Sequence, residues 1–188
     1  MFNLQIITVS TRDNRVGPAV AQWFIGESQN HGKFNVDPID LADVDLPLFD
    51  EPNHPRMQQY MHDHTRRWSE IIKRADAFVF VMPEYNHHAP PSIVNALDYL
   101  GSEWAYKPVG FVSYGGVSGG TRGVESLLNI LATLKLVPMA EAVNIPMFFQ
   151  HIDQATGAFN PGERQAQATI TMLDELLRWT GALKTLRA

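Results

Sequence analysis

The sequence predicts an α/β fold in which one parallel β-sheet carries helices on both faces. Apolar runs typical of strands alternate with helical patterns along the chain, and this alternation is characteristic of parallel α/β proteins. Residues 77–82 (AFVFVM) form an apolar run with no polar alternation. A strand of this composition has to be buried on both faces, as in the centre of a parallel sheet.

The first elements follow from the apolar pattern and from the residues that interrupt it. Residues 4–9 (LQIITV) predict the first strand, and residues 18–31 repeat apolar side chains at helical spacing. Pro18 suits the first position of this helix, and Gly32 is placed to end it. A short second strand is expected at 34–40.

The middle of the chain predicts a long helix at 56–75, just before the buried strand. Its apolar face would consist of Met57, Tyr60, Met61, His64, Trp68, Ile71 and Ile72. Most of this face is expected to pack in the core, and part of it offers apolar surface for a second subunit. A shorter helix is expected at 91–100.

The last third of the chain predicts a strand at 108–113, a helix at 121–136 and a final strand at 138–145. Residues 160–163 (NPGE) have the pattern of an N-cap, a first-turn proline and a capping-box acid. We therefore expect the final helix to begin there and to end at about residue 182.

Five strands with intervening helices leave two plausible strand orders. The flavodoxin-like order 2-1-3-4-5 brings the loops after strands 1, 3 and 4 to one edge of the sheet. Because these three loops have the most unusual composition in the chain, we expect this order. The prediction is a single domain, residues 1–188, with a three-layer flavodoxin-like fold.

Composition excludes several classes of function. The chain has 188 residues, a net charge of −5 and no cysteine. The acidic balance argues against nucleic acid as a partner, and the lack of cysteine removes disulfides and thiolate chemistry. We see neither a signal peptide nor an apolar run of about 18 residues, so the expectation is a cytoplasmic protein without membrane insertion.

The loop after the first strand has the composition of a phosphate site. Ser10, Arg12 and Arg15 precede a helix start, and Gly17 allows the backbone to approach an anion closely. The alternative is a capped helix with solvated arginines. The loop is neither a Walker motif nor a Gly-x-Gly-x-x-Gly fingerprint, which disfavours an ATP enzyme or a Rossmann dehydrogenase.

The loop after the third strand, residues 83–91, combines prolines with planar side chains. Such a loop can present backbone N–H groups to a flat heterocycle, whereas the alternative is a polar connection packed by Tyr85. His87 and His88 are adjacent and therefore point apart, and no nearby carboxylate or cysteine completes a ligand set. We expect no metal here.

The glycine-rich loop after the fourth strand, residues 115–120, indicates unusual backbone angles or close approach of a ligand. It also matches the Gly-x-Ser-x-Gly pattern of a hydrolase nucleophile at Ser118. Glu141 and His151 would then have to act as acid and base, and Glu141 is poorly placed at the end of a strand. The serine hydrolase is therefore the weaker alternative.

Taken together, the three loops resemble those of the NADPH-dependent FMN reductase family, from about Ile6 to Leu136. The resemblance is carried by Ser10 and Arg12, by 83–86 with Pro90, Asn95-Ala96 and 98–100, and by 107–109, 113–116, Gly119-Gly120 and Arg122. It implies that FMN is held by thirteen residues: Ser10, Arg12, Arg15, Val16, Gly17, Pro83, Glu84, Tyr85, Asn86, Tyr114, Gly115, Gly116 and Gly119.

The same resemblance implies an oxidoreductase in which the flavin carries the chemistry, with no catalytic side chain and no metal. NADPH or NADH would supply a hydride, and a quinone-like, azo, metal-oxyanion or free-flavin acceptor would take up the electrons. A homodimer or homotetramer is expected. Arg122 and Lys107 are candidates for binding the 2′-phosphate of NADPH. The alternative from another class is a flavin-binding electron carrier or sensor without turnover.

The sequence also departs from the family pattern. Val9 stands where a glycine is common, and Pro90-Pro91 replaces a Pro-Gly pair. Residues 93–95 are Ile-Val-Asn instead of Leu-Lys-Asn, so a positive charge close to the flavin is missing. The phosphate motif at Ser10 and Arg12 is retained.

Overall fold

The computed structural model describes residues 1–187. Its strands are β1 (Phe2–Thr8), β2 (Phe34–Asp40), β3 (Ala77–Pro83), β4 (Pro108–Tyr114), β5 (Val137–Pro138) and β6 (Val143–Ile145). Its α-helices are α1 (Gly17–His31), α2 (Leu41–Val44), α3 (Asp63–Lys73), α4 (Pro91–Asp98), α5 (Thr121–Leu134) and α6 (Glu163–Lys184). Short 3-10 turns lie at Pro55–Met57, Ser102–Trp104 and Phe148–His151.

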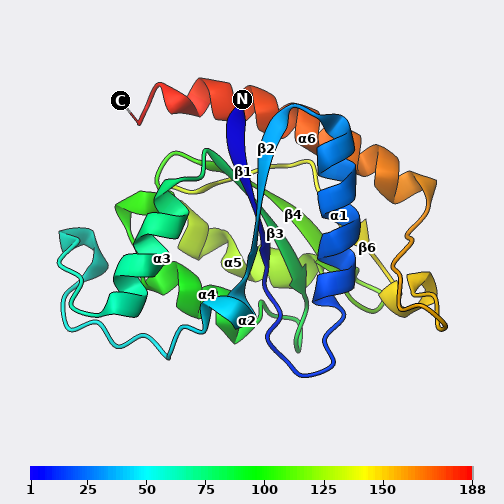
Figure 1. Cartoon of the computed structure of the whole chain (residues 1–188), viewed down its shortest axis with the longest axis horizontal. Helices are drawn as coiled ribbons and strands as arrows, with labels where there is room; N and C mark the ends of the chain where they lie inside the picture. The colour runs from blue at the N-terminus through cyan, green and yellow to red at the C-terminus, as the bar shows by residue number, and fades with distance from the viewer. Residues whose placement is uncertain (188) are drawn as a thin grey trace.

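The strands form one parallel sheet in the order β2-β1-β3-β4-β5, with β6 also paired to β4. The predicted α/β fold and strand order are therefore confirmed. In Figure 1, β1, β3 and β4 lie side by side in the middle of the molecule, so their carboxyl ends open at one edge of the sheet.

Each face of the sheet packs against its own set of helices. On one face, side chains of α1 and α6 join Leu4, Ile6, Val79 and Val81 in a single apolar cluster. On the other face, α3, α4 and α5 cover Phe78, Phe80 and Phe111. All six residues of the apolar run 77–82 are fully buried, as its composition predicts.

The fifth strand is divided, whereas we expected one strand at 138–145. Val109 of β4 pairs with Pro138, and Val112 of β4 pairs with Val143. The chain from Pro138 to Val143 is therefore longer than the stretch of β4 that it accompanies. The extra residues leave the ladder, and because Pro138 has no N–H it weakens pairing at the point of division.

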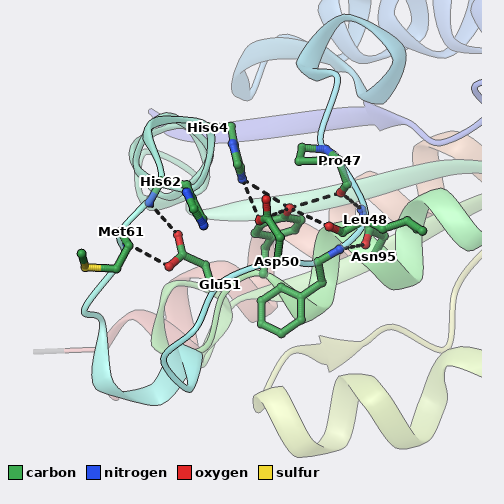
Figure 2. Close-up of polar contacts among 10 residues, drawn as sticks. Pro47, Leu48, Asp50, Glu51, Met61, His62, His64 and Asn95 are labelled. Carbon is green, nitrogen blue, oxygen red and sulfur yellow. Dashed lines mark hydrogen bonds and ion pairs between the residues drawn. The ribbon is translucent and has the colours of Figure 1, made fainter.

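The helix predicted at 56–75 is wrong in its first half. The 3-10 turn at Pro55–Met57 ends at Gln58, whose φ of 52° is left-handed, and α3 begins only at Asp63. His62, the N-cap of α3, has no side-chain capping bond. Instead, Glu51 accepts hydrogen bonds from the N–H groups of Met61 and His62 (2.8 and 3.0 Å, Figure 2).

This change of helix start also changes the predicted apolar face. Trp68 and Ile72 are fully buried in the core, as expected. Met57 and Met61 precede α3, and 56% and 60% of their surface is exposed. The loop at 45–62 therefore carries Met57, Tyr60 and Met61, three of the side chains that the sequence pattern assigned to the long helix.

The capping box predicted for the final helix is also wrong. α6 starts at Glu163 after Gly162, which has a φ of 89° and no side chain to cap the helix. Asn160 instead donates its backbone N–H to the carbonyl of His151, 2.8 Å away. The helix itself extends to Lys184, close to the expected end.

Candidate functional site

The loops that follow β1, β3 and β4 meet at one cleft of about 350 Å³ at the carboxyl edge of the sheet. A volume of this size is within the range of ordinary ligand pockets. The guanidinium carbon of Arg12 lies 5.5 Å from the centre of the Tyr85 ring, so the first two loops touch across the cleft. The lining residues are Ser10, Arg12, Asp13, Asn14, Arg15, Val16, Pro83, Glu84, Tyr85, Tyr114, Gly115, Gly116 and Phe148.

Ten of the thirteen predicted cofactor residues line this cleft, and Gly17, Asn86 and Gly119 do not. Three further lining residues were missed by the sequence analysis: Asp13, Asn14 and Phe148. Asp13 and Asn14 lie inside the predicted loop, so their position in the chain was a usable signal. Phe148 follows β6, and its N–H donates to the carbonyl of Gly115 over 3.3 Å, a contact with no local sequence signal.

Gly17 supports the floor of the cleft, although it does not line it. A Cβ at this position would meet Ser10 Oγ at 2.2 Å and Tyr114 Oη at 3.0 Å. The Tyr114 hydroxyl also lies 3.4 Å from Ser10 Oγ, and both side chains are buried. Burial raises the pKa of Tyr114, which therefore stays neutral and holds its proton in this contact.

The two arginines of the first loop have different roles in the structure. Arg15 Nη1 donates to Ser10 O and to Asp40 Oδ1, both at 2.7 Å, and the hydrogen bond to Asp40 raises the pKa of Arg15. Asp40 also caps α2 by accepting from Ala42 N. Arg15 therefore stabilises the conformation of the loop, whereas the exposed guanidinium of Arg12 faces Tyr85 in the cleft.

The first N–H groups of α1 receive no side-chain cap and are available to bind an anion. Its N-cap, Val16, has no side-chain capping bond, and the first turn contains no acidic residue. A helix start without its own carboxylate or hydroxyl favours an external negative charge. This loop contributes a single acidic residue to the lining of the cleft within residues 1–187, namely Asp13.

The second loop is a tight two-residue turn. Tyr85 and His88 exchange two backbone hydrogen bonds of 2.9 Å, and the residues between them, Asn86 and His87, have φ values of 52° and 62°. Two successive left-handed residues define a type I′ turn, which Asn tolerates better than most residues. The turn fixes the direction in which Tyr85 projects from the end of β3.

The third loop is bound to the second through Glu84. Ser118 Oγ donates to Glu84 Oε2 over 2.9 Å, and Arg122 N donates to the same oxygen over 3.1 Å. The hydroxyl of Ser118 is therefore engaged by a carboxylate that also caps α5. This arrangement does not support the serine hydrolase alternative, because a nucleophilic serine needs its proton accepted by a base such as histidine.

Two glycines outside the cleft lining allow the third loop to turn sharply. Gly119 and Gly120 have φ values of 61° and 85°, and a Cβ on Gly119 would lie 3.0 Å from Pro146 N. Ser113 Oγ donates to the carbonyl of Gly119 over 2.8 Å. Gly119 thus sets the path of the loop, and Gly115 and Gly116 present its inner side to the cleft.

The proposed role of Lys107 in binding a 2′-phosphate is wrong. Lys107 precedes β4, at the opposite edge of the sheet from the cleft, and its ammonium donates to the carbonyl of Ile72 over 2.8 Å. Burial, together with the positive charge of Arg187, lowers the pKa of Lys107 to about 8. Arg122 remains near the cleft, since its Nη1 lies 3.7 Å from Glu84 Oε1.

Within residues 1–187, no three side chains of His, Cys, Asp or Glu are arranged to hold a metal ion. None of the helices described is both long enough and apolar enough to cross a bilayer.

The fold and the position of the cleft define a flavodoxin-like α/β protein with a ligand site at the carboxyl edge of its sheet. A solved structure with the same fold is the NAD(P)H:(acceptor) oxidoreductase FerB from Paracoccus denitrificans. It superposes with a TM-score of 0.73 and 20% identity, covering 97% of this chain and 98% of that one.

The family model described as NADPH-dependent FMN reductase matches residues 3–150, and the chain belongs to this family. The NAD(P)H-dependent FMN reductase of Schizosaccharomyces pombe is 37% identical over 75% of this chain and 72% of its own. A quinone reductase of Escherichia coli is 32% identical over 69% of each chain. The protein is therefore an enzyme of the NAD(P)H-dependent FMN reductase or quinone reductase type.

Proposed function

We propose that the protein holds FMN in the cleft formed by the loops after β1, β3 and β4. The observation that carries this proposal is the convergence of the three loops on one cleft, with Arg12 facing Tyr85. When bound there, FMN would accept a hydride from NADPH or NADH and deliver the electrons to a small acceptor molecule. The protein supplies position and electrostatics, and no side chain acts as a nucleophile.

The first loop suits the phosphate of FMN. A phosphate monoester carries about −1.5 to −2 charge near pH 7. The unpaired start of α1, the buried Ser10 hydroxyl and the guanidinium of Arg12 supply the complementary groups. Arg15 contributes by holding the Ser10 carbonyl and thus the shape of the loop.

The other two loops suit a flat ring. Residues 83–86 provide a proline, the Tyr85 side chain and a rigid turn on one side. Gly115 and Gly116 present a surface without side-chain bulk on the other, next to the buried ring of Tyr114. The N–H groups of Tyr85 and His88 are paired within the turn. Those of Asn86 and His87 are therefore the donors suited to stabilise negative charge on a reduced ring, because preorganised donors need no rearrangement.

Among acceptors, we propose a quinone-like compound first, since the Escherichia coli relative is named a quinone reductase. Azo compounds, metal oxyanions and free flavin fit the same scheme. An electron carrier or sensor without turnover is disfavoured, because the relatives are named as reductases. Steady-state oxidation of NADPH and NADH with FMN and a quinone distinguishes a reductase from a carrier.

We also propose that the chain forms a homodimer or homotetramer. The 45–62 loop exposes Leu48, Met57 and Met61, whose surfaces are 83%, 56% and 60% accessible. Exposed apolar side chains of this kind favour contact with a second copy. Light scattering during size-exclusion chromatography tests this proposal, and a monomer at micromolar concentration would contradict it.

The phosphate assignment predicts unequal effects of the two arginines. Arg12→Ala removes a charge in the cleft with no structural partner apart from Tyr85, so we expect FMN affinity to fall at least about tenfold with little change in stability. Arg15→Ala breaks the contacts to Asp40 and Ser10 and should lower stability as well as affinity. FMN titration and urea unfolding measure both. Unchanged FMN affinity in Arg12→Ala would contradict the phosphate assignment.

A further inference from the structure

The carboxylate of Glu84 ties the second loop to the third at the rim of the cleft. Glu84 Oε2 accepts from Ser118 Oγ (2.9 Å), from Arg122 N (3.1 Å) and from Gly123 N (3.4 Å). Arg122 Nη1 lies 3.7 Å from the other carboxylate oxygen. Only 8% of the Glu84 side chain is exposed, whereas half of the Arg122 side chain is exposed.

These contacts replace a cap that α5 lacks. The N-cap of α5 is Gly120, which has no side chain to bind the first N–H groups of the helix. A carboxylate at a helix start satisfies these donors and interacts favourably with the helix dipole. Glu84 therefore caps a helix that begins more than thirty residues further along the chain.

The packing at this point is close. A Cβ on Gly123 would lie 3.5 Å from Glu84 Cα and 3.3 Å from the carbonyl of His88. The first turn of α5 thus contacts both ends of the 84–88 segment. Movement of the helix start would move the turn that carries Tyr85.

We propose that Glu84 is a positioning residue: its carboxylate, by reaching the start of α5, fixes the distance between the 85–88 turn and the 115–120 loop. This inference rests on the proposed function, because these two loops are the ones assigned to the flavin ring. The reach of the side chain is the essential property, and its charge is secondary.

The test compares two variants that separate reach from charge. Glu84→Gln keeps the length and an acceptor oxygen, whereas Glu84→Asp keeps the charge and shortens the side chain by about 1.5 Å, one C–C bond. We expect Glu84→Asp to raise the Kd of FMN about tenfold, because displacement of binding groups by about 1 Å is costly. We expect Glu84→Gln to raise the Kd of FMN less than Glu84→Asp does, because the amide oxygen of Gln can still accept from the same donors.

Glu51 provides a matched control elsewhere in the chain. It also caps a helix whose N-cap residue makes no side-chain bond, since its carboxylate accepts from Met61 N and His62 N before α3 (Figure 2). Glu51 does not line the cleft. Glu51→Asp and Glu51→Gln should lower stability while leaving the Kd of FMN unchanged.

Hydrogen exchange of residues 85–88 in the FMN-free protein gives a second readout. Faster exchange in Glu84→Asp than in Glu84→Gln supports the inference, even if the protein were found not to bind FMN and the proposed function failed. The inference is overturned if both Glu84 variants bind FMN and exchange like the unmodified protein. It is also overturned if Glu84→Gln is the more impaired of the two, because charge would then be the essential property.

Discussion

At the scale of single residues, Gly17 shows most clearly how the sequence shapes the cleft. The backbone at this position passes so close to Ser10 and Tyr114 that a Cβ would lie 2.2 Å from Ser10 Oγ. Real Cβ contacts are never that short, so any larger residue has to push the hydroxyl away. Glycine is required here for space, and its φ is not unusual.

We therefore expect Gly17→Ala to lower the free energy of unfolding by about 1–3 kcal/mol, the usual cost of overpacking, and to weaken FMN binding. Urea unfolding and FMN titration measure the two effects. Gly26→Ala is the matched control, because Gly26 lies in the same helix with nothing near its missing Cβ. That change should stabilise the protein by about 0.5–1 kcal/mol. Equal behaviour of the two variants would contradict this account of Gly17.

Lys107 makes stability depend on pH in the alkaline range. Burial lowers its pKa to about 8, whereas the reference value is 10.5. Between these values the unfolded chain holds a proton that the folded chain has released, so stability rises with pH. We expect a gain of roughly 1 kcal/mol per pH unit between pH 8 and pH 10.

Urea unfolding at several pH values measures this slope. Lys107→Met should flatten it, because the titrating group is gone. Lys73→Met serves as the control, since Lys73 is half exposed and pairs with Glu70 at the surface. The explanation is wrong if Lys107→Met keeps the full slope.

Single residues were predictable where the requirement is local. Ser10, Arg12 and Gly17 were recognisable because a hydroxyl, a cation and a glycine before a helix suit an anion. The ion pair of Arg15 with Asp40 was not recognisable, because Asp40 belongs to a different strand and is brought near only by the β1–β2 pairing. Lys107 was misplaced for a different reason. It directly precedes the predicted strand at 108–113, so the sequence already indicated the amino end of that strand, opposite the cleft.

At the scale of elements, α3 depends on a carboxylate from outside its own sequence. Glu51 is buried, and burial alone would raise its pKa. Hydrogen bonds to the carboxylate, led by the one from Met61 N–H, outweigh this effect and lower the pKa of Glu51 from its ordinary value. The folded state therefore favours the ionised carboxylate, and the stabilisation is lost as the pH falls through the lowered pKa.

We expect Glu51→Ala to lower stability at pH 7 by about 1–2 kcal/mol, as does the loss of a helix cap. The difference from the unmodified protein should shrink at acidic pH, once Glu51 is protonated. Urea unfolding from pH 7 to pH 3 measures it, with Glu70→Ala on the exposed face of α3 as the control. A deficit that is independent of pH would show that the carboxylate is not acting as a charged cap.

The elements were predictable where the spacing of apolar residues agrees with nearby proline and glycine residues that start or end an element. The buried strand β3 and the helix α1, with its Pro18 and Gly32, followed from these signals. The false start of α3 arose because Met57 and Met61 continue the helical spacing of Trp68 and Ile72 into a loop. The remote cap by Glu51, which sets the true start, is a tertiary contact and leaves no pattern near residue 62.

At the scale of the whole molecule, the order of the strands decides where function is placed. Because β1, β3 and β4 are neighbours and parallel, three loops that lie between Ser10 and Gly116 in the sequence share one cleft. This convergence was predictable from composition alone, since each strand ends in an unusual loop. The contribution of Phe148 was not predictable, because it depends on the path of the chain after β6.

The molecule also has a larger cavity, which provides a competing location for a ligand. This cavity, of about 540 Å³, lies between the 49–56 segment and residues 98–101 and 133–134. It contains none of the residues at the carboxyl ends of β1, β3 and β4. Volume alone would favour it, whereas the charge and loop chemistry favour the cleft beside Arg12.

Hydrogen exchange with and without FMN identifies which of the two cavities binds the cofactor, because it reports on backbone N–H groups along the whole chain in the same sample. Binding at the shared cleft predicts slower exchange in residues 10–17, 83–88 and 114–120, with little change elsewhere. Protection confined to residues 49–56 and 98–101, or no protection at saturating FMN, would contradict the account.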